Sequence, residues 1–489
     1  MTVNANGYRE ANAAFAATSV DLGKFHVGAG SLTGSVGVTN DVAADGFSES
    51  LSLVSSGTTG GASVTNLAGL IAAGATRNLG VGLSSVSAIG LNSGTITLSK
   101  ASSGSGTSGL ADLSQGNQVV TVTATGYSGK SIWSVDANGD WNSFAGWDGP
   151  GGKPGVDGSL SVDDTATFAG AATDARTITL GSAVPTLRSL TFNNASASYY
   201  IAPGGSGRLQ LGTSSGNGAL SVLAGNHTVS AGIELAQATT ASVAAGSRLL
   251  VSGALTGSAA LTKSGAGQLV IDSTGSLSGA TTVAAGLLTV NGSIADSDVT
   301  VASGGTLGGR GAVGATTIQS GGTLAPGNSP GTLTTTGNAT WLGGGQYNWQ
   351  LYNATGVAGT GWDLNEITGN LVLTSLDSSN RYSINVWTLS SINTDVNGDA
   401  INFNEAQSYT WTIARAASII GFNASHFVLN LTPSNGAAGF DNAYTGSFSV
   451  QASGGDLNIV YTPIPEPSTY GVVAALGALV IAARRRRRS

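Results

Sequence analysis

The chain has 489 residues, of which 9% are charged and 41% hydrophobic, with 75 glycines and no cysteine. Apart from five consecutive arginines near the C-terminus it has 14 basic and 26 acidic residues, a net charge of −12, which excludes the basic surface that a nucleic-acid partner needs. The lack of cysteine excludes disulfides, thiolate metal sites and a catalytic cysteine. Short runs in which Val, Ile and Thr alternate with Gly, Ser and Asn predict an all-β protein.

The first residues match a later segment of the same chain. Residues 2–8, TVNANGY, and residues 121–127, TVTATGY, share Thr, Val, Ala, Gly and Tyr in register. We interpret residues 1–15 as the remnant last strand of an upstream copy of the domain that follows. Since the start also lacks a charged region followed by an apolar stretch, we expect the true start codon and a signal peptide to lie upstream.

Residues 16–130 contain alternating segments separated by Gly and Ser turns, such as GSVGVTN (34–40) and NQVVTVTATGY (117–127). Several strands in a segment of this length predict an immunoglobulin-like β-sandwich. The segment resembles the sandwich modules that accompany surface anchors in exported bacterial proteins. Its single histidine, His26, is interpreted as a strand or surface residue rather than a ligand.

Residues 131–170 are rich in tryptophan, with the run WSVDANGDWNSFAGW at 133–147. We interpret this segment as an N-terminal cap, in which Trp133, Trp141 and Trp147 cover the first coil of the region that follows.

Residues 171–340 contain a repeat of about 20 residues. Short alternating strands each end at a glycine: Gly225, Gly246, Gly265, Gly286, Gly304 and Gly321. A strand and a glycine turn in every unit predict a solenoid, and the fixed Leu and Asn positions of leucine-rich repeats are absent. We therefore predict a right-handed parallel β-helix, with Val243, Val283, Val301 and Ile318 pointing inward and glycine at the corners.

This region resembles the autotransporter-associated β-strand repeat. The run LTKSGAGQLVIDSTGSLSGATTVAAGLLTVNGS (261–293) has the Leu-Thr-Lys-x-Gly-x-Gly opening of that repeat, and SGGTLAPGNSPGTLTTTGN (320–338) resembles the motif that often closes such arrays. The resemblance implies an extended β-helical segment on an exported protein.

Residues 341–462 are richer in aromatic residues than the repeats, and runs such as QYNWQLYN and SYTWTIA predict longer strands. We interpret them as a β-rich C-terminal domain or cap. Within it, DVNGD (395–399) places Asp395, Asn397 and Asp399 at alternate positions, as at the start of a calcium-binding loop. The glycine and the bidentate acid that complete such a loop are missing, so an Asx-Gly turn is the simpler interpretation. The same holds for DANGD at 136–140.

The last segment, 463–489, has three parts in order: the proline-rich run Pro463–Pro467, the uncharged run 468–483, and five arginines. As a helix, the uncharged run would be about 24 Å long, and arginine side chains can extend a short span to the membrane surface. We predict a single transmembrane helix that includes Tyr470, Gly471, Leu476, Leu479 and Ile481. The positive-inside rule places the basic anchor in the cytoplasm, and it consists of Arg484, Arg485, Arg486, Arg487 and Arg488.

This arrangement resembles the PEP-CTERM sorting signal of Gram-negative bacteria, with Pro465, Glu466 and Pro467 as the sorting motif. The resemblance implies recognition by an exosortase-type processing enzyme, a transient inner-membrane anchor, and release to the cell surface or extracellular matrix. It also implies an association with exopolysaccharide.

We therefore expect an exported structural or adhesin-like protein that has no cofactor and no catalytic residues. The first alternative is a carbohydrate-binding surface protein that uses Trp and Tyr residues of 341–411 as stacking platforms. The second is a β-helix polysaccharide lyase or hydrolase, which needs a cluster of charged residues. Only eight charged residues are spread over 201–335, which disfavours the enzyme.

Overall fold

A computed structural model describes residues 7–160, 162–392, 395–432 and 439–464. These residues form strands joined by turns; among them there is no α-helix, and the helical turns are the short 3-10 segments Phe144–Gly146 and Ala424–His426. Contacts divide the chain into two compact units, the first made of residues 1–134 and 143–154 and the second of residues 135–142 and 155–489. The division assigns Trp133 and Trp147 to the first unit and Trp141 to the second.

The first unit consists of two four-stranded sheets. One has the order β1 (Ala13–Phe15), β3 (Leu32–Asn40), β6 (Thr76–Leu83), β5 (Ala62–Thr65); the other has the order β2 (Ser19–His26), β8 (Leu113–Tyr127), β7 (Gly90–Ser103), β4 (Ser50–Thr58). Neighbouring strands are antiparallel except β2 and β8, which are parallel. One face of each sheet is buried in a common core that includes Val36, Leu79, Leu98 and Val122. The strand β9 (Lys130–Trp133) follows, and Trp133 meets Trp147 edge to face at 5.2 Å.

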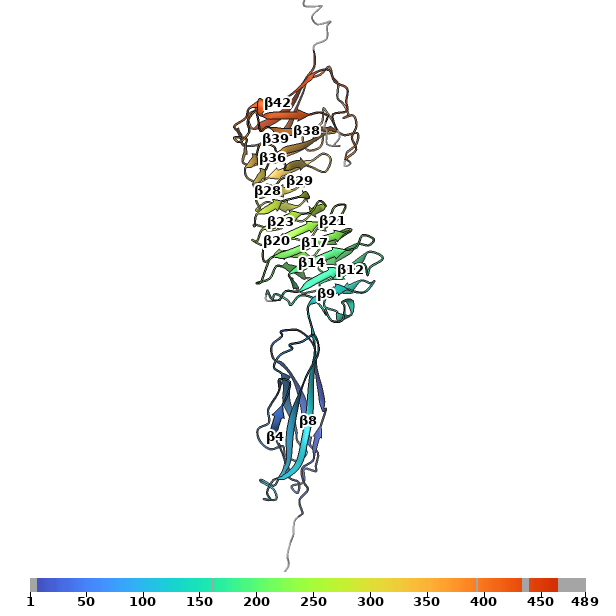
Figure 1. Ribbon diagram of the computed structural model, residues 1–489, viewed down its shortest axis with the longest axis vertical. Coiled ribbons are helices and arrows are strands. Elements are labelled where there is room, and N and C mark those ends of the chain that lie inside the picture. Colours follow the sequence, from blue (N-terminus) through green and yellow to red (C-terminus); the bar gives the residue numbers. More distant parts are fainter. Residues whose placement is uncertain (1–6, 161, 393–394, 433–438, 465–489) are drawn as a thin grey trace, which may run out of the picture. The chain divides into compact units, whose positions relative to one another are not determined.

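The second unit is a parallel β-solenoid, in which successive coils stack their strands into two long sheets and a third, interrupted face (Figure 1). Sheet 1 contains β11 (Thr165–Phe168), β14 (Ser189–Asn193), β17 (Gly218–Ala224), β20 (Thr239–Val243), β23 (Leu261–Ser264), β25 (Thr281–Val283), β28 (Val299–Val301), β31 (Thr316–Ile318), β34 (Ala339–Trp341), β37 (Asn370–Val372) and β40 (Ser418–Ile420).

Sheet 2 contains β10 (Gly139–Asp140), β12 (Arg176–Thr179), β15 (Tyr199–Ala202), β18 (Asn226–Val229), β21 (Arg248–Val251), β24 (Gln268–Ile271), β26 (Gly286–Val290), β29 (Gly305–Gly309), β32 (Thr323–Pro326), β35 (Gln346–Leu351), β38 (Tyr382–Thr388) and β41 (Phe427–Asn430).

The third face has two stretches. The first contains β13 (Thr186–Leu187), β16 (Arg208–Leu211), β19 (Gly232–Leu235) and β22 (Leu255–Thr256). The second contains β27 (Ser293–Ile294), β30 (Ala312–Val313), β33 (Thr332–Thr335), β36 (Leu364–Ile367), β39 (Tyr409–Arg415), β43 (Asp456–Thr462) and β42 (Ser447–Ser453). Here β39, β43 and β42 pair antiparallel, which ends the parallel stacking on this face.

The interior of the solenoid is a set of in-register columns. Along sheet 1, the side chains of Ala241, Lys263, Val283, Val301 and Ile318 stack from coil to coil and are all buried. The four residues that the repeat predicted to point inward, Val243, Val283, Val301 and Ile318, are each fully buried. The six predicted corner glycines all have positive φ, between 67° and 89°, a backbone conformation that glycine adopts without strain: Gly225, Gly246, Gly265, Gly286, Gly304 and Gly321.

The parallel ladders continue beyond residue 340. β35 pairs in parallel with both β32 and β38, and β38 pairs with β41. Trp341 lies in the same inward column as Ile318, and Tyr347 lies in the same column as Leu324. Both aromatic side chains are fully buried, so the change of composition at residue 341 corresponds to larger core residues within the same stack of coils.

Lys263 and His227 are two of the polar side chains that are buried inside the coils. The Lys263 Nζ donates hydrogen bonds to the backbone oxygens of Ser264, Gly265 and Ala285 at 2.8, 2.7 and 3.0 Å, and burial lowers its pKa from 10.5 to about 8. The His227 ring is stacked on Phe192 at 4.8 Å. Its Nδ1 accepts a hydrogen bond from the Tyr199 N–H, so the neutral ring donates from Nε2 to the Ala224 oxygen. Burial lowers the pKa of His227.

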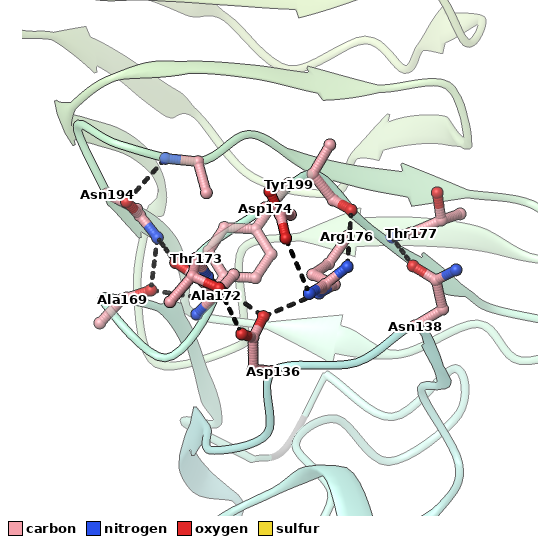
Figure 2. A network of polar contacts seen from close by, with 12 residues as sticks. Asp136, Asn138, Ala169, Ala172, Thr173, Asp174, Arg176, Thr177, Asn194 and Tyr199 are labelled. Carbon is pink, nitrogen blue, oxygen red and sulfur yellow. Dashed lines mark hydrogen bonds and ion pairs between the residues drawn. The ribbon is translucent and has the colours of Figure 1, made fainter.

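A polar network holds the beginning of the solenoid together (Figure 2). The Asp136 carboxylate accepts hydrogen bonds from the Arg176 Nε at 2.8 Å and from the Thr173 N–H and hydroxyl, and these contacts lower its pKa to about 2. The Asn138 Oδ1 accepts the Thr177 N–H at 2.8 Å. Two of the oxygens in the DANGD run are therefore used to hold β12 in place.

Candidate functional site

A groove of about 360 Å³ lies on the outward face of sheet 2, within the range of ~300–1,000 Å³ usual for ligand pockets. The outward positions of its strands form the floor, and the loops around residues 327–329, 363 and 395 contribute the remaining residues. The lining residues are Gln268, Leu287, Thr289, Thr306, Gly308, Gly309, Ala325, Pro326, Gly327, Asn328, Ser329, Asn348, Gln350, Asp363, Trp387 and Asp395.

The floor is built by strand register. Gln268, Leu287 and Thr306 stand side by side in β24, β26 and β29, because parallel pairing aligns the same outward position of each strand. In the next outward column Thr289 is followed by Gly308 and Ala325. These two small residues leave the middle of the floor hollow.

Asp363 braces one side of the groove. Its two carboxylate oxygens accept the backbone N–H groups of Gly331 at 2.8 Å and Gln350 at 3.0 Å, which ties the 327–331 loop to β35. The side chain is 1% exposed. Burial raises the pKa of Asp363 well above its usual range, and the nearby Asp395 carboxylate raises it further, against the lowering effect of the two N–H donors.

The three residues proposed for calcium have different neighbours. Asp395 lines the groove, where its carboxylate accepts hydrogen bonds from the Ser329 hydroxyl and from the Gln350 Nε2 at 3.0 Å. The Asn397 side-chain amide donates to Asp441, and Asp399 is exposed. Within the described part of the chain, no group of three or more His, Asp or Glu residues has the arrangement of a metal site.

Most of the aromatic residues predicted as stacking platforms are buried in the core: Trp341, Tyr347, Trp349, Trp362 and Trp411. They therefore offer no surface to a ligand, and for them the stacking prediction is wrong. Trp387 differs, because it faces outward beside Gln350 and lines the groove half buried. Its Nε1 is buried and has no hydrogen-bond partner among the described residues.

Sequence reasoning missed Gln350, Asp363 and the groove role of Trp387. Each is an isolated polar or aromatic residue in its own strand or turn, and only the register of β35 with β38 brings Gln350 next to Trp387. The run APGNSPG, noted as a repeat-closing motif, supplies Asn328 and Ser329 to the lining. The sequence signal that could have indicated the groove is the presence of polar residues at outward positions of successive coils.

The predicted sorting and anchor residues lie outside the described residues. They are Pro465, Glu466, Pro467, Tyr470, Gly471, Leu476, Leu479, Ile481 and Arg484–Arg488. In the part of the chain that is described, no helix has the length and hydrophobicity to cross a membrane.

The described fold defines a class, a parallel β-solenoid protein with a groove on one of its sheets. Residues 463–488 match the PEP-CTERM protein-sorting motif, which begins one residue after β43 ends at Thr462. The match identifies an exported protein that is directed to the cell envelope and sorted by exosortase. No curated protein sequence matches the chain significantly.

Proposed function

We propose that this chain is a structural or adhesin-like protein of the cell surface or extracellular matrix, and that it performs no catalysis. The observation that carries the proposal is the sorting motif that follows directly after the last strand, β43, of a long β-solenoid. A solenoid whose coils contact only their neighbours is suited to act as a spacer or an extended contact surface.

The proposal includes the route of export. Residues 468–483 form a helix that anchors the chain in the inner membrane in transit, with the Arg484–Arg488 cluster on the cytoplasmic side. An exosortase-type enzyme recognises Pro465-Glu466-Pro467 and releases the chain to the outside. The motif match supports this route, and the positive-inside rule supports the orientation.

The proposal also assigns finer identities to the two units. The first is an immunoglobulin-like module, and the second is an array of autotransporter-associated β-strand repeats that coils right-handed, as parallel crossovers nearly always do. The Leu261-Thr262-Lys263 opening supports the repeat assignment. An association with exopolysaccharide is the remaining part of the proposal, and the groove on sheet 2 favours it.

The test is the intact mass of the protein in membrane and medium fractions, for the natural chain and for a variant with Pro465, Glu466 and Pro467 changed to alanine. We expect the natural chain to lose the residues after about 465 and the variant to remain uncut in the membrane. An uncut natural chain in the membrane would make the helix a permanent tether, and an uncut cytoplasmic chain would refute export.

A further inference from the structure

We propose that the groove on sheet 2 binds an extended strand of a neutral polysaccharide, with the sugar chain parallel to the solenoid axis. This inference rests on the proposed association with exopolysaccharide and names its ligand class, but it does not depend on the sorting route, which the mass measurement tests separately. It rests on the shape of the groove, on its hydrogen-bonding groups, on Trp387 and on its charge.

The shape fits a linear polymer. The floor uses residues of six successive strands of sheet 2, namely β24, β26, β29, β32, β35 and β38. Strands in a sheet lie about 4.8 Å apart, so the floor extends for about 24 Å along the axis. Gly308 and Ala325 keep its middle free of long side chains.

The polar groups of the lining suit hydroxyl groups. The amides of Gln268, Asn328, Asn348 and Gln350 can each donate and accept hydrogen bonds, as a sugar hydroxyl also does. The exposed Asp395 carboxylate is an acceptor held in position by Ser329 and Gln350. Charge-assisted acceptance from a hydroxyl is one of the stronger hydrogen bonds available to such a ligand.

Trp387 supplies the apolar element that sugar recognition requires. The C–H groups on one face of a pyranose ring pack on an aromatic side chain, and an indole combines a large apolar area with one donor. Trp387 is the outward neighbour of Gln350 across β35 and β38, so an apolar contact and an amide lie side by side.

The charge of the groove selects against acidic polymers. None of its described lining residues is Lys, Arg or His, and its two ionisable side chains are the carboxyl groups of Asp363 and Asp395. A uronic acid chain would place its carboxylates beside Asp395 without a compensating cation, and like charges in contact are unfavourable. The ligand class is therefore a neutral glycan.

The test fills the groove with a bulky side chain and compares this variant with one that has the same substitution on another face of the solenoid. Thr306 and Thr317 are both half-buried, outward threonines and each is the second residue of its strand, Thr306 on the groove floor in β29 and Thr317 on sheet 1 in β31. We would titrate the full chain, T306W and T317W with cellohexaose, laminarihexaose, mannohexaose and hexagalacturonic acid by calorimetry. Circular dichroism would verify that both variants keep the strand content of the parent.

We expect at least one of the three neutral hexasaccharides to bind the parent and T317W equally and T306W at least tenfold more weakly. Trp387→Leu should weaken the same binding by a similar factor. The proposal is overturned if no neutral hexasaccharide binds, if T306W binds as well as T317W, or if hexagalacturonic acid binds as tightly as the neutral chains. Shortening of a hexasaccharide during the titration would also overturn it, because the groove would then be an active site.

Discussion

The buried lysine gives the sharpest test of the solenoid interior. Lys263 occupies an inward column between Ala241 and Val283, and its ammonium group is held by three backbone oxygens. Its pKa is lowered from 10.5 to about 8, so between these values the unfolded chain binds more protons than the folded one. The free energy of unfolding therefore rises with pH across this window.

The size of the effect follows from the shift. The interval from about 8 to 10.5 is about 2.5 pH units, and at ~1.36 kcal/mol per unit it amounts to about 3 kcal/mol. Methionine is unbranched and adapts to an apolar column, so the K263M variant removes the titration while filling the same space. We expect the stability of the natural chain to gain about 3 kcal/mol relative to K263M between pH 7 and pH 10.5.

The assay is guanidinium chloride unfolding followed by circular dichroism at several pH values from 7 to 10.5, and the absence of cysteine removes thiol chemistry at high pH. Lys130→Met, at an exposed position of the first unit, is the control for loss of one positive charge. If the difference in the free energy of unfolding between the natural chain and K263M stays constant with pH, the reasoning is refuted. That result would mean that the three carbonyl groups fully compensate the ammonium group for its burial.

Three further predictions concern other parts of the second unit. Burial lowers the pKa of His227, so as the pH falls below 6.5 this histidine is protonated in the unfolded chain before it is protonated in the folded one. The denaturant midpoint of unfolding should therefore decrease between pH 7 and 5 in the natural chain. It should decrease less in the His227→Leu variant, whose leucine matches Leu249, the in-register residue of the next coil. The pKa of Asp136 is lowered to about 2, so its contribution to folding stability is fully present above pH 3.8 and is lost as the pH falls toward 2. At neutral pH, Asp136→Asn should speed the hydrogen exchange of the Thr173 amide, which donates to this carboxylate. Unchanged exchange would contradict the network. Gly246→Ala should lower the free energy of unfolding by about 1–2 kcal/mol, because of the positive φ alone. Gly286→Ala should lower it clearly more, because the added Cβ would lie 2.4 Å from the Gly265 oxygen. Equal unfolding midpoints for the two variants would contradict this packing.

The solenoid was predictable from the sequence because its two main determinants are local. Glycine adopts a positive φ without strain, so the six repeated glycines marked the corners, and alternation of apolar residues marked the inward positions. The inward position of Lys263 was not predictable, because it depends on carbonyl groups of the next coil, at Ala285. The aromatic residues after 340 were interpreted as a C-terminal domain or cap, and only the structure shows that their strands pair in register with the preceding coils.

The groove could not be predicted from the sequence, since its residues come from separate strands and turns. Gln350 lies beside Trp387 because β35 and β38 pair in parallel, and Asp395 joins the same groove by accepting a hydrogen bond from Gln350. Asp395 was selected from the sequence for a different reason, its place at the start of a run that resembles a calcium-binding loop. Its observed contacts are with Ser329 and Gln350, which lie 66 and 45 residues earlier in the chain.

The regular coil has a consequence for how such a gene can change. Each coil pairs with the one before and the one after, so duplication of a whole coil before β24 would preserve both the Asp136 network at the start and the antiparallel β39–β43–β42 pairing at the end. The groove between β24 and β38 would also be retained. Unequal recombination within the repeats can therefore lengthen or shorten the solenoid without changing the structure at either end. The length of the protein can then evolve separately from the residues that line the groove.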